Sequence, residues 1–301
     1  MERASNTKKT YSGSASAILT ADWHLREDQP ICRTDDFWET QWRKIRFIAE
    51  LQNDNNNCPI IHAGDLFNHW KPSPWLLSMA LLNLPDGNTF YTVCGNHDLP
   101  QHNLDNVYKS GMQTLANAGK IEILPNGHWG QSIKEGQIFN EALAVWHGLV
   151  FPKDGEGWPG VEGITASRLL GKCSSDIIVT GHNHTPFVEK GSKKILVNPG
   201  SITRQTADQS NMRPRVYLWW ERSNDVQPVY LPIDENVISR NHLVDTNHLE
   251  ERQNRMEAFL QLLHGEGWEA DVSFEQNLQR LMDKRKLANS VREIILGAIG
   301  K

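Results

Sequence analysis

The sequence predicts an α/β protein in which a sheet is covered by helices on both faces. Short apolar runs typical of strands alternate with longer segments whose apolar residues recur at helical spacing. The strand-like runs span residues 17–20, 59–62, 90–93, 142–146 and 177–180. With 301 residues, the chain is long enough for one large α/β domain and a smaller appendage.

Three helices are expected among these strands. The first covers residues 34–51, the second 74–84 and the third 104–118, each with apolar side chains at helical spacing. Pro74 suits the first turn of the second helix, and Gly119 follows the end of the third. The order strand, helix, strand is typical of a parallel sheet with helices on both faces.

The later part of the chain indicates further strands and then a change of texture. Further strands are expected at 121–124, 195–197 and 215–219, and a Gly- and Pro-containing loop at 152–163. From about residue 234 the pattern is amphipathic and helical, notably over 249–263 and at possible capping boxes from Ser273 and Ser290. We therefore predict a flexible arm (1–14), a main domain (15–233) and a C-terminal helical appendage (234–301), whose apolar faces either pack on the main domain or contact a partner.

Composition limits the class of protein. No apolar run approaches the roughly 20 residues that span a bilayer, so no membrane partner and an intracellular, cytoplasmic location are expected. Four cysteines without Cys-x-x-Cys spacing favour reduced, buried thiols. The net charge of −5 argues against binding nucleic acid by electrostatics alone, so DNA contacts would need local basic patches, metals or a partner. The eleven tryptophans are better explained by core packing than by base stacking.

Metal-ligand residues recur where the predicted strands end. The candidates are Asp22 and His24, Asp65, Asn96, His147, and His182 with His184. Because the carboxyl ends of parallel strands meet at one edge of a sheet, these side chains can converge. Two carboxylates, one amide oxygen and four imidazoles suit two divalent ions bridged by one carboxylate.

Each candidate alone also has an ordinary explanation. A single histidine at a strand end is usually a hydrogen-bonded structural residue, and Gly-Asp is a common turn dipeptide. All five segments together, in this order, favour a metal centre. His97 would point away from the metals, towards a leaving group, and Asp98 would support the site rather than bind an ion. The remaining histidines considered fit no ligand position, and we interpret them as structural: His62, His69, His102 and His128.

This series of motifs resembles the signature of calcineurin-like metallophosphoesterases over about residues 15–220. The resemblance implies a four-layer α/β/β/α sandwich and a dinuclear manganese, iron or zinc centre. It implies two ligand sets that share one aspartate: Asp22, His24, Asp65 and His184 for one ion, and Asp65, Asn96, His147 and His182 for the other. His97 matches the family's transition-state histidine, and Asp98 accompanies it at the catalytic site.

Within that superfamily, three segments resemble SbcD-type nucleases, the bacterial and phage relatives of the eukaryotic Mre nuclease. They are residues 64–67, 95–100 and 198–201. This resemblance implies a DNA exo- or endonuclease that acts on ends or single strands with an SbcC-type ATPase, and it adds a homodimer as a further partner hypothesis. Manganese is the most expected metal, with iron, zinc or magnesium as alternatives.

The chain is shorter after its main domain than most such nucleases, and its 201–204 turn is similar to phage-encoded members. Arg204 is therefore predicted to bind substrate, together with other loop cations that surface solubility explains equally well: Lys71, Lys153 and Arg213.

Two other functions stay open. The chain could be a phosphatase or phosphodiesterase acting on nucleotides, phosphoproteins or nucleic-acid ends. It could also be a non-catalytic scaffold of the same fold, although the full ligand set argues against this, because converging polar groups are costly without a metal.

Overall fold

The computed structural model describes residues 13–85, 89–124, 143–152 and 163–241, with short pieces at 278–279, 282–287, 291–292 and 295. The chain divides into two compact units, Met1–Ser239 and Arg240–Lys301. Residues 234–239 thus belong to the first unit: the Thr34 N–H donates to Val237 O, and the Ser239 N–H donates to Cys32 O. Residues 1–12 of the predicted arm (1–14), residues 153–162 of the predicted loop, the amphipathic segment 249–263, and Ser273 and Ser290 of the two capping boxes lie outside the described residues.

The first sheet has six strands in the order β12-β11-β1-β2-β3-β4. Their bounds are β1 (Ala17–Thr20), β2 (Ile60–His62), β3 (Phe90–Thr92), β4 (Glu122–Ile123), β11 (Arg215–Trp220) and β12 (Asp225–Tyr230). Strands β1 to β4 are parallel to one another, whereas β11 and β12 are antiparallel to their neighbours.

The second sheet has four strands in the order β5-β8-β10-β9. Their bounds are β5 (Leu143–His147), β8 (Ile177–Gly181), β9 (Phe187–Lys190) and β10 (Ile195–Asn198). Strands β5, β8 and β10 are parallel, and β9 is antiparallel at the edge. A separate pair consists of β6 (Val150–Phe151) and β7 (Ile164–Thr165).

Helices α1 (Phe37–Asp54) and α2 (Pro74–Asn83) confirm the first two helix predictions. The prediction of one helix over 104–118 was wrong, because a 3-10 helix at Leu104–Lys109 precedes α3 (Gly111–Asn117). Ser110 separates them: its backbone is extended, and its side chain caps α3 by accepting the Gln113 N–H. The last helix of the first unit is α4 (Ala166–Lys172).

Side chains of the first sheet alternate between two cores, as the two-residue period of a strand requires. Ile18, Ile60 and Phe90 pack with Trp42 and the other core residues of α1, α2 and α3. Their neighbours Leu19, Ile61 and Tyr91 pack against Leu143, Ile177 and Ile195 of the second sheet.

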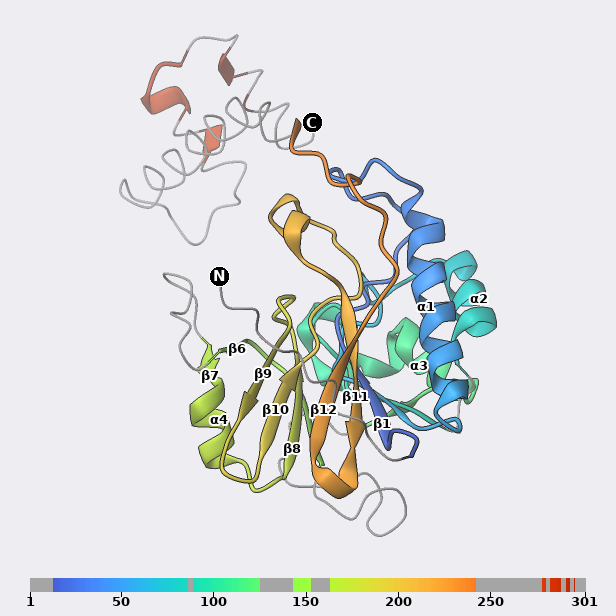
Figure 1. Ribbon diagram of the computed structural model, residues 1–301. Helices are drawn as coiled ribbons and strands as arrows, with labels where there is room; N and C mark the ends of the chain where they lie inside the picture. Colours follow the sequence, from blue (N-terminus) through green and yellow to red (C-terminus); the bar gives the residue numbers. More distant parts are fainter. Residues whose placement is uncertain are drawn as a thin grey trace, which may run out of the picture. The chain divides into compact units, whose positions relative to one another are not determined.

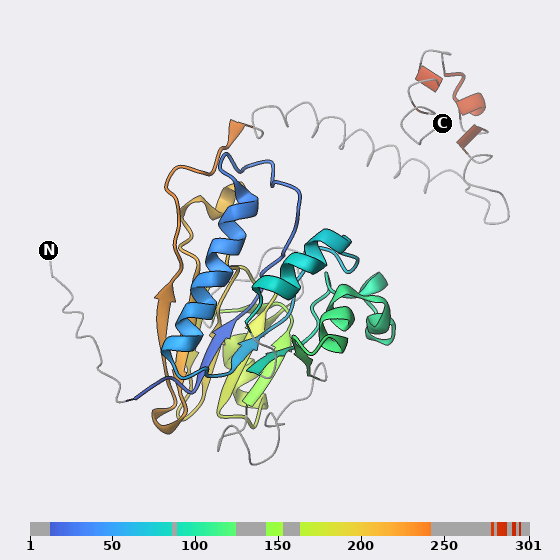
Figure 2. The ribbon, with the colours of Figure 1, turned by 90° about the vertical axis from the view of Figure 1, so that its right-hand side faces the viewer.

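A third core joins the second sheet to α4, through Ile178, Leu196 and Leu169. The layers are therefore α/β/β/α, with α1 to α3 on one side and α4 on the other (Figure 1). Figure 2 shows α1 and α2 side by side over the first sheet. The four-layer α/β/β/α class implied by the family resemblance is confirmed. The prediction of one sheet with helices on both faces was wrong, because the second face of each sheet packs against the other sheet.

Composition-based expectations can also be checked. The four cysteines are free and buried, as predicted. Trp23, Trp42 and Trp219 are fully buried in the core, whereas Trp75 is 58% exposed and stacks on Trp38. Among the described residues, none of the helices has the length and apolar character needed to cross a membrane.

Candidate metal centre

The candidate ligands gather where five strands end. Asp22 and His24 follow β1, Asp65 follows β2, Asn96 follows β3, His147 ends β5, and His182 and His184 follow β8. Potential ligand atoms approach within 4.8 Å of one another in three groups: Asp22, His24 and His184; His24, Asp65 and His97; and Asp65, His147 and His182. The structure therefore brings the residues predicted from sequence into one site.

The backbone at this site is unusual. Asp22, His24, Asp65 and His182 all have positive φ, at 50°, 47°, 57° and 80°. Such left-handed conformations cost about 1–3 kcal/mol each in non-glycine residues and persist only where the surroundings enforce them. Sharp turns straight after the strands are thus maintained at the positions that carry the ligands.

Glycines allow the loops to approach one another. At Gly64, which has φ of 89°, a Cβ would lie 2.5 Å from His147 Nδ1. At Gly95 a Cβ would lie 2.1 Å from Asp65 Oδ1. Side chains at either position would displace the candidate ligands, which explains why glycine precedes Asp65 and Asn96.

The first ligand group consists of Asp22, His24 and His184. His24 Nε2 lies 3.0 Å from His184 Nε2, and His24 Nδ1 is buried with no hydrogen-bond partner. Asp22 is fully buried, and its carboxylate accepts the His182 N–H at 2.9 and 3.1 Å. Burial raises the pKa of Asp22 to about 7, partly opposed by His147. Burial also lowers the pKa of His24 well below its usual value and that of His184 to about 4, which favours the neutral imidazoles that bind metals.

The second ligand group consists of Asn96, His147 and His182. His147 Nδ1 donates to Ala63 O at 2.8 Å, which directs Nε2 to Asn96 Oδ1 at 3.1 Å. His182 Nδ1 lies 2.9 Å from the same amide oxygen. Burial would lower the pKa of His147, but the Asp65 carboxylate, helped by that of Asp22, raises it to about 9. The two carboxylates therefore favour a positive charge at His147.

Asp65 lies between the two groups. Its Oδ1 accepts the His97 N–H at 2.9 Å, and its Oδ2 lies 3.3 Å from His147 Nε2 and 3.5 Å from His24 Nε2. Burial would raise the pKa of Asp65, but the hydrogen bond with His147 and the charges of the surrounding imidazoles lower it overall. The carboxylate is thus ionised and faces both ligand groups.

His97 and Asp98 lie beside the ligand groups and differ from each other. His97 is exposed, and its Nδ1 donates to Asn68 O at 2.8 Å, so Nε2 is the ring nitrogen left for a substrate. Asp98 is fully buried and accepts the N–H groups of Gly95, Leu66 and Phe67 at 3.0 to 3.2 Å. Burial, followed by the charge of Asp65, raises the pKa of Asp98 to about 7. Asp98 links the two ligand loops and is a positioning residue.

The segment 198–201 shapes the turn that carries His184. The Asn198 amide donates to Asn183 O at 2.6 Å and to Thr185 O at 2.9 Å. The Ser201 N–H donates to His184 O at 3.2 Å. The sequence motif at 198–201 was noted as a family resemblance, but nothing in the sequence indicated that it supports His184.

Arg204 differs from the sequence-based expectation of a loop cation that binds substrate. It is only 6% exposed, and its guanidinium donates to Ser210 O at 3.0 Å and to Asp234 O at 2.8 Å. The guanidinium is thus bound to backbone carbonyls of the segments around Ser210 and Asp234, which cover it. Of the histidines interpreted as structural, His62 is buried beside Thr92 and His69 accepts the Lys71 N–H, whereas His102 contacts Asn96 O. His128 lies outside the described residues.

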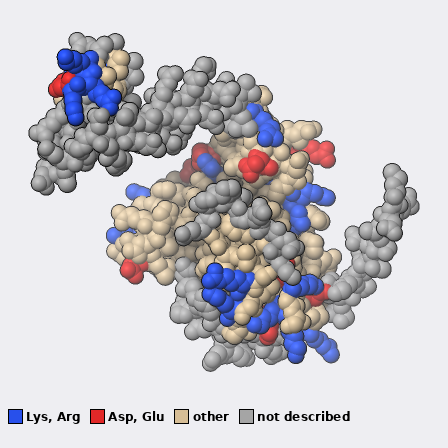
Figure 3. Space-filling model, turned by 90° about the vertical axis from the view of Figure 1, so that its left-hand side faces the viewer, with Lys and Arg blue, Asp and Glu red and all other residues tan. Residues whose placement is uncertain are grey.

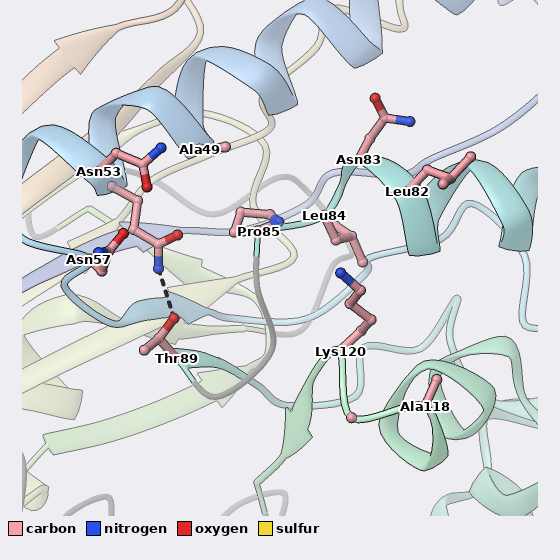
Figure 4. A pocket seen from close by; sticks show the side chains of 12 residues that line it. Ala49, Asn53, Asn57, Leu82, Asn83, Leu84, Pro85, Thr89, Ala118 and Lys120 are labelled. Carbon is pink, nitrogen blue, oxygen red and sulfur yellow. Dashed lines mark hydrogen bonds between the residues drawn. The ribbon is translucent and has the colours of Figure 1, made fainter.

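A separate pocket of about 740 Å³ lies at the opposite edge of the first sheet (Figure 4). It is lined by residues from the ends of α1, α2 and α3 and from the segment leading into β3. Among the residues that the structure describes, its lining includes the amides Gln52, Asn53, Asn57 and Asn83 but no acidic residue or histidine. The groups suited to metal chemistry therefore belong to the other edge of the sheet.

Comparisons with known proteins agree with this geometry. The family model described as the calcineurin-like phosphoesterase superfamily domain matches residues 18–216. A probable metallophosphoesterase from Methanothermobacter thermautotrophicus is 30% identical over 97 residues, or 31% of this chain and 51% of that protein. The match thus spans about half the length of that relative.

Two solved structures are similar at low sequence identity. A novel archaeal phosphodiesterase is 16% identical, with a TM-score of 0.42, over 71% of this chain and 99% of that chain. A metallophosphoesterase from Sphaerobacter thermophilus is 14% identical, with a TM-score of 0.39, over 74% of this chain and 89% of that chain. The family match, which covers most of the first unit, shows that the chain belongs to the calcineurin-like phosphoesterase superfamily.

Proposed function

We propose that this phosphoesterase is a dinuclear-metal-dependent phosphodiester hydrolase. The observation that carries the proposal is the position of the Asp65 carboxylate, whose Oδ2 lies 3.3 Å from His147 Nε2 and 3.5 Å from His24 Nε2 and so faces both ligand groups. Asp22, His24, Asp65 and His184 would hold one divalent ion, and Asp65, Asn96, His147 and His182 the other.

The residues present fit such ions. Carboxylate, amide and imidazole donors suit manganese, iron or zinc. A cation would separate the facing Nε2 atoms of His24 and His184. It would also supply the positive charge that the Asp65 and Asp22 carboxylates favour at His147. When bound, the ions would supply Lewis acidity to the phosphate and to the attacking water.

The side chains of the protein then supply positioning and proton transfer. His97 Nδ1 donates to Asn68 O, so the opposite nitrogen, Nε2, faces the substrate, and in the doubly protonated ring Nε2 would donate its proton to the departing sugar oxygen. Asn96 contributes a neutral oxygen, which adds no negative charge beside the phosphate. Asp98 fixes the loops that carry Asp65 and Asn96.

The finer proposal is a DNA exo- or endonuclease subunit of the SbcD type, acting on ends or single strands with an SbcC-type ATPase in the cytoplasm of a bacterial or phage-infected cell. The motifs at 64–67, 95–100 and 198–201 support it. Lys and Arg side chains gather on the side of the molecule that carries α4 (Figure 3). Arg168 and Lys172 on α4 and Lys193 beyond β9 are exposed cations there, which gives a chain of net charge −5 a local surface for phosphates.

The test compares substrates with the full-length protein in manganese. We expect slow cleavage of linear duplex or single-stranded DNA, acceleration by an SbcC-type ATPase, and hydrolysis of a small aryl phosphodiester. DNA binding should weaken steeply with salt, because phosphate contacts release counterions.

The His97→Ala protein, purified in parallel, controls for contaminating nucleases. If the full-length protein hydrolyses cyclic nucleotides or phosphomonoesters efficiently but leaves every DNA form intact, the nuclease proposal is wrong and a nucleotide phosphodiesterase or phosphatase replaces it. If it hydrolyses no phosphoester at all, the scaffold alternative replaces both.

A further inference from the structure

We propose that His102 is a positioning residue of the metal centre, acting through the peptide group that joins Asn96 to His97. This inference rests on the proposed dinuclear centre. His102 fits no ligand position, so its role could not be predicted from the sequence.

Two hydrogen bonds hold the peptide group that joins Asn96 to His97. His102 Nδ1 lies 2.8 Å from Asn96 O, and because a carbonyl only accepts, Nδ1 carries the proton. The N–H of the same peptide group, on His97, donates to Asp65 Oδ1 at 2.9 Å. A carbonyl that accepts a hydrogen bond makes its own N–H a stronger donor, so the two bonds reinforce each other.

This peptide group influences three functional side chains. It precedes the His97 ring, it follows the Cα that carries the Asn96 amide, and its N–H orients the Asp65 carboxylate. A rotation of the peptide plane would therefore disturb the shared carboxylate and both neighbouring side chains together.

The loop that presents His102 has an unfavourable backbone. Gln101 and His102 both have φ of 54°, and two successive non-glycine residues in the left-handed region carry a cost. The turn is closed by backbone bonds from the His102 N–H to Leu99 O and from the Asn103 N–H to Pro100 O, both at 3.1 Å. The Leu99 N–H also reaches Asn96 O, but at 3.5 Å, which is too long to fix the carbonyl alone.

Three substitutions separate the two ring nitrogens. His102→Ala removes both, His102→Asn retains a donor at the position of Nδ1, and His102→Gln places its donor nearer the position of Nε2. His69→Ala is the matched control, because His69 is also exposed and accepts the Lys71 N–H without contacting a ligand residue among its described partners.

Manganese affinity is measured by calorimetry on the metal-free 301-residue chain, and thermal unfolding is measured on the same metal-free protein. The values of kcat and KM are measured on a small aryl phosphodiester after the protein is loaded with saturating manganese. For His102→Ala we expect about tenfold weaker manganese binding and a kcat lowered by about 10- to 100-fold, with KM within about twofold of the wild type. His102→Asn should restore both affinity and kcat, His102→Gln should not, and His69→Ala should match the wild type.

Four results would overturn the proposal. His102→Ala could leave manganese affinity and kcat unchanged, or His102→Gln could restore them where His102→Asn does not, which would assign the effect to Nε2. Equal losses of metal-free stability and kcat in the Ala and Asn variants would indicate a purely structural turn residue. A wild-type protein that binds no manganese would overturn both this inference and the proposed centre, whereas failure to cleave DNA alone affects only the nuclease proposal.

Discussion

Two clusters of buried polar side chains lie in the first unit, and they satisfy their hydrogen bonds in opposite ways. The basic cluster consists of Arg33, Lys44 and Arg204, which are all at most 6% exposed. Lys44 Nζ donates to Ile202 O at 2.7 Å, and Arg33 donates to Arg204 O and pairs with Asp35. Only Nε of Arg204 lacks a partner within this cluster.

The metal-ligand cluster is arranged differently. Two of its imidazole nitrogens, on His24 and His184, face each other at 3.0 Å, and His24 Nδ1 has no partner. The Asp65 carboxylate lies between imidazoles of both ligand groups, and His147 Nε2 and His182 Nδ1 converge on Asn96 Oδ1. The comparison teaches that burial of polar groups alone does not mark a functional site. The basic cluster is held by backbone carbonyls and by Asp35 and fixes the loop after β10, whereas the ligand cluster would be completed by a cation under the proposed function.

The largest effect that sharpens this comparison is expected at His97, which lies beside the ligand cluster without belonging to either ligand group. His97→Ala should keep the metals and lose about 10²- to 10⁴-fold in kcat, as expected for a lost acid or positioning group. Elemental analysis and kinetics on an aryl phosphodiester measure the two properties separately. Loss of metal from the variant would show that His97 is a ligand.

Arg204 gives the next largest effect and tests whether the basic cluster is structural. Arg204→Ala should lower the free energy of unfolding by about 3 kcal/mol, because two carbonyls lose a charged donor. Metal content and KM should stay unchanged. Denaturant unfolding measures the free energy, elemental analysis the metal content, and kinetics the KM. The control is Arg213→Ala, because Arg213 is exposed over the Tyr230 ring. A higher KM with unchanged stability would instead restore the sequence-based prediction that Arg204 binds substrate.

Lys44 gives an effect that depends on pH and that is smaller than the effect of Arg204 within any one pH unit. Burial, reinforced by the charges of Arg33, Arg204 and Arg43 and opposed by Asp35, lowers the pKa of Lys44 to about 7 from 10.5. Between these values the unfolded chain binds the proton and the folded protein does not. The contribution of Lys44 to stability therefore rises with pH from about 7 to 10.5, by up to about 1.4 kcal/mol per pH unit, and is constant below 7.

The Lys44→Met variant isolates this contribution, because other groups titrate equally in both proteins. We expect the unfolding free energy of the wild type, relative to that of Lys44→Met, to rise as the pH increases from 7 to 10.5. A difference that stays constant over that range would show that Lys44 keeps its usual pKa in the folded state.

The convergence of the candidate ligands could be predicted from sequence, because each of them lies at or just after the end of a strand that is recognisable as an apolar run. Asp22, Asp65 and His147 are examples in which the chemistry and the position agree. The contact of His102 with Asn96 and the burial of Arg204 could not be predicted, because both depend on how loops fold back in three dimensions.

The fold shows the same limits. Strands β1 to β3 could be predicted from their apolar runs, whereas β12 contains Pro228, which argues against a strand unless it lies at a sheet edge. The break before α3 depends on Ser110, whose capping role competes with the continuous apolar pattern around it. The local sequence pattern therefore predicted those helices and strands whose tertiary packing follows the same pattern.

The most direct test of the dinuclear centre is the number of divalent ions per chain in the wild type and in Asp65→Ala, measured by elemental analysis after loading with manganese. Because the Asp65 carboxylate faces both ligand groups, we predict two ions per chain in the wild type and the loss of both in Asp65→Ala. Full metal content in Asp65→Ala, or a single ion in the wild type, would contradict the shared-carboxylate site.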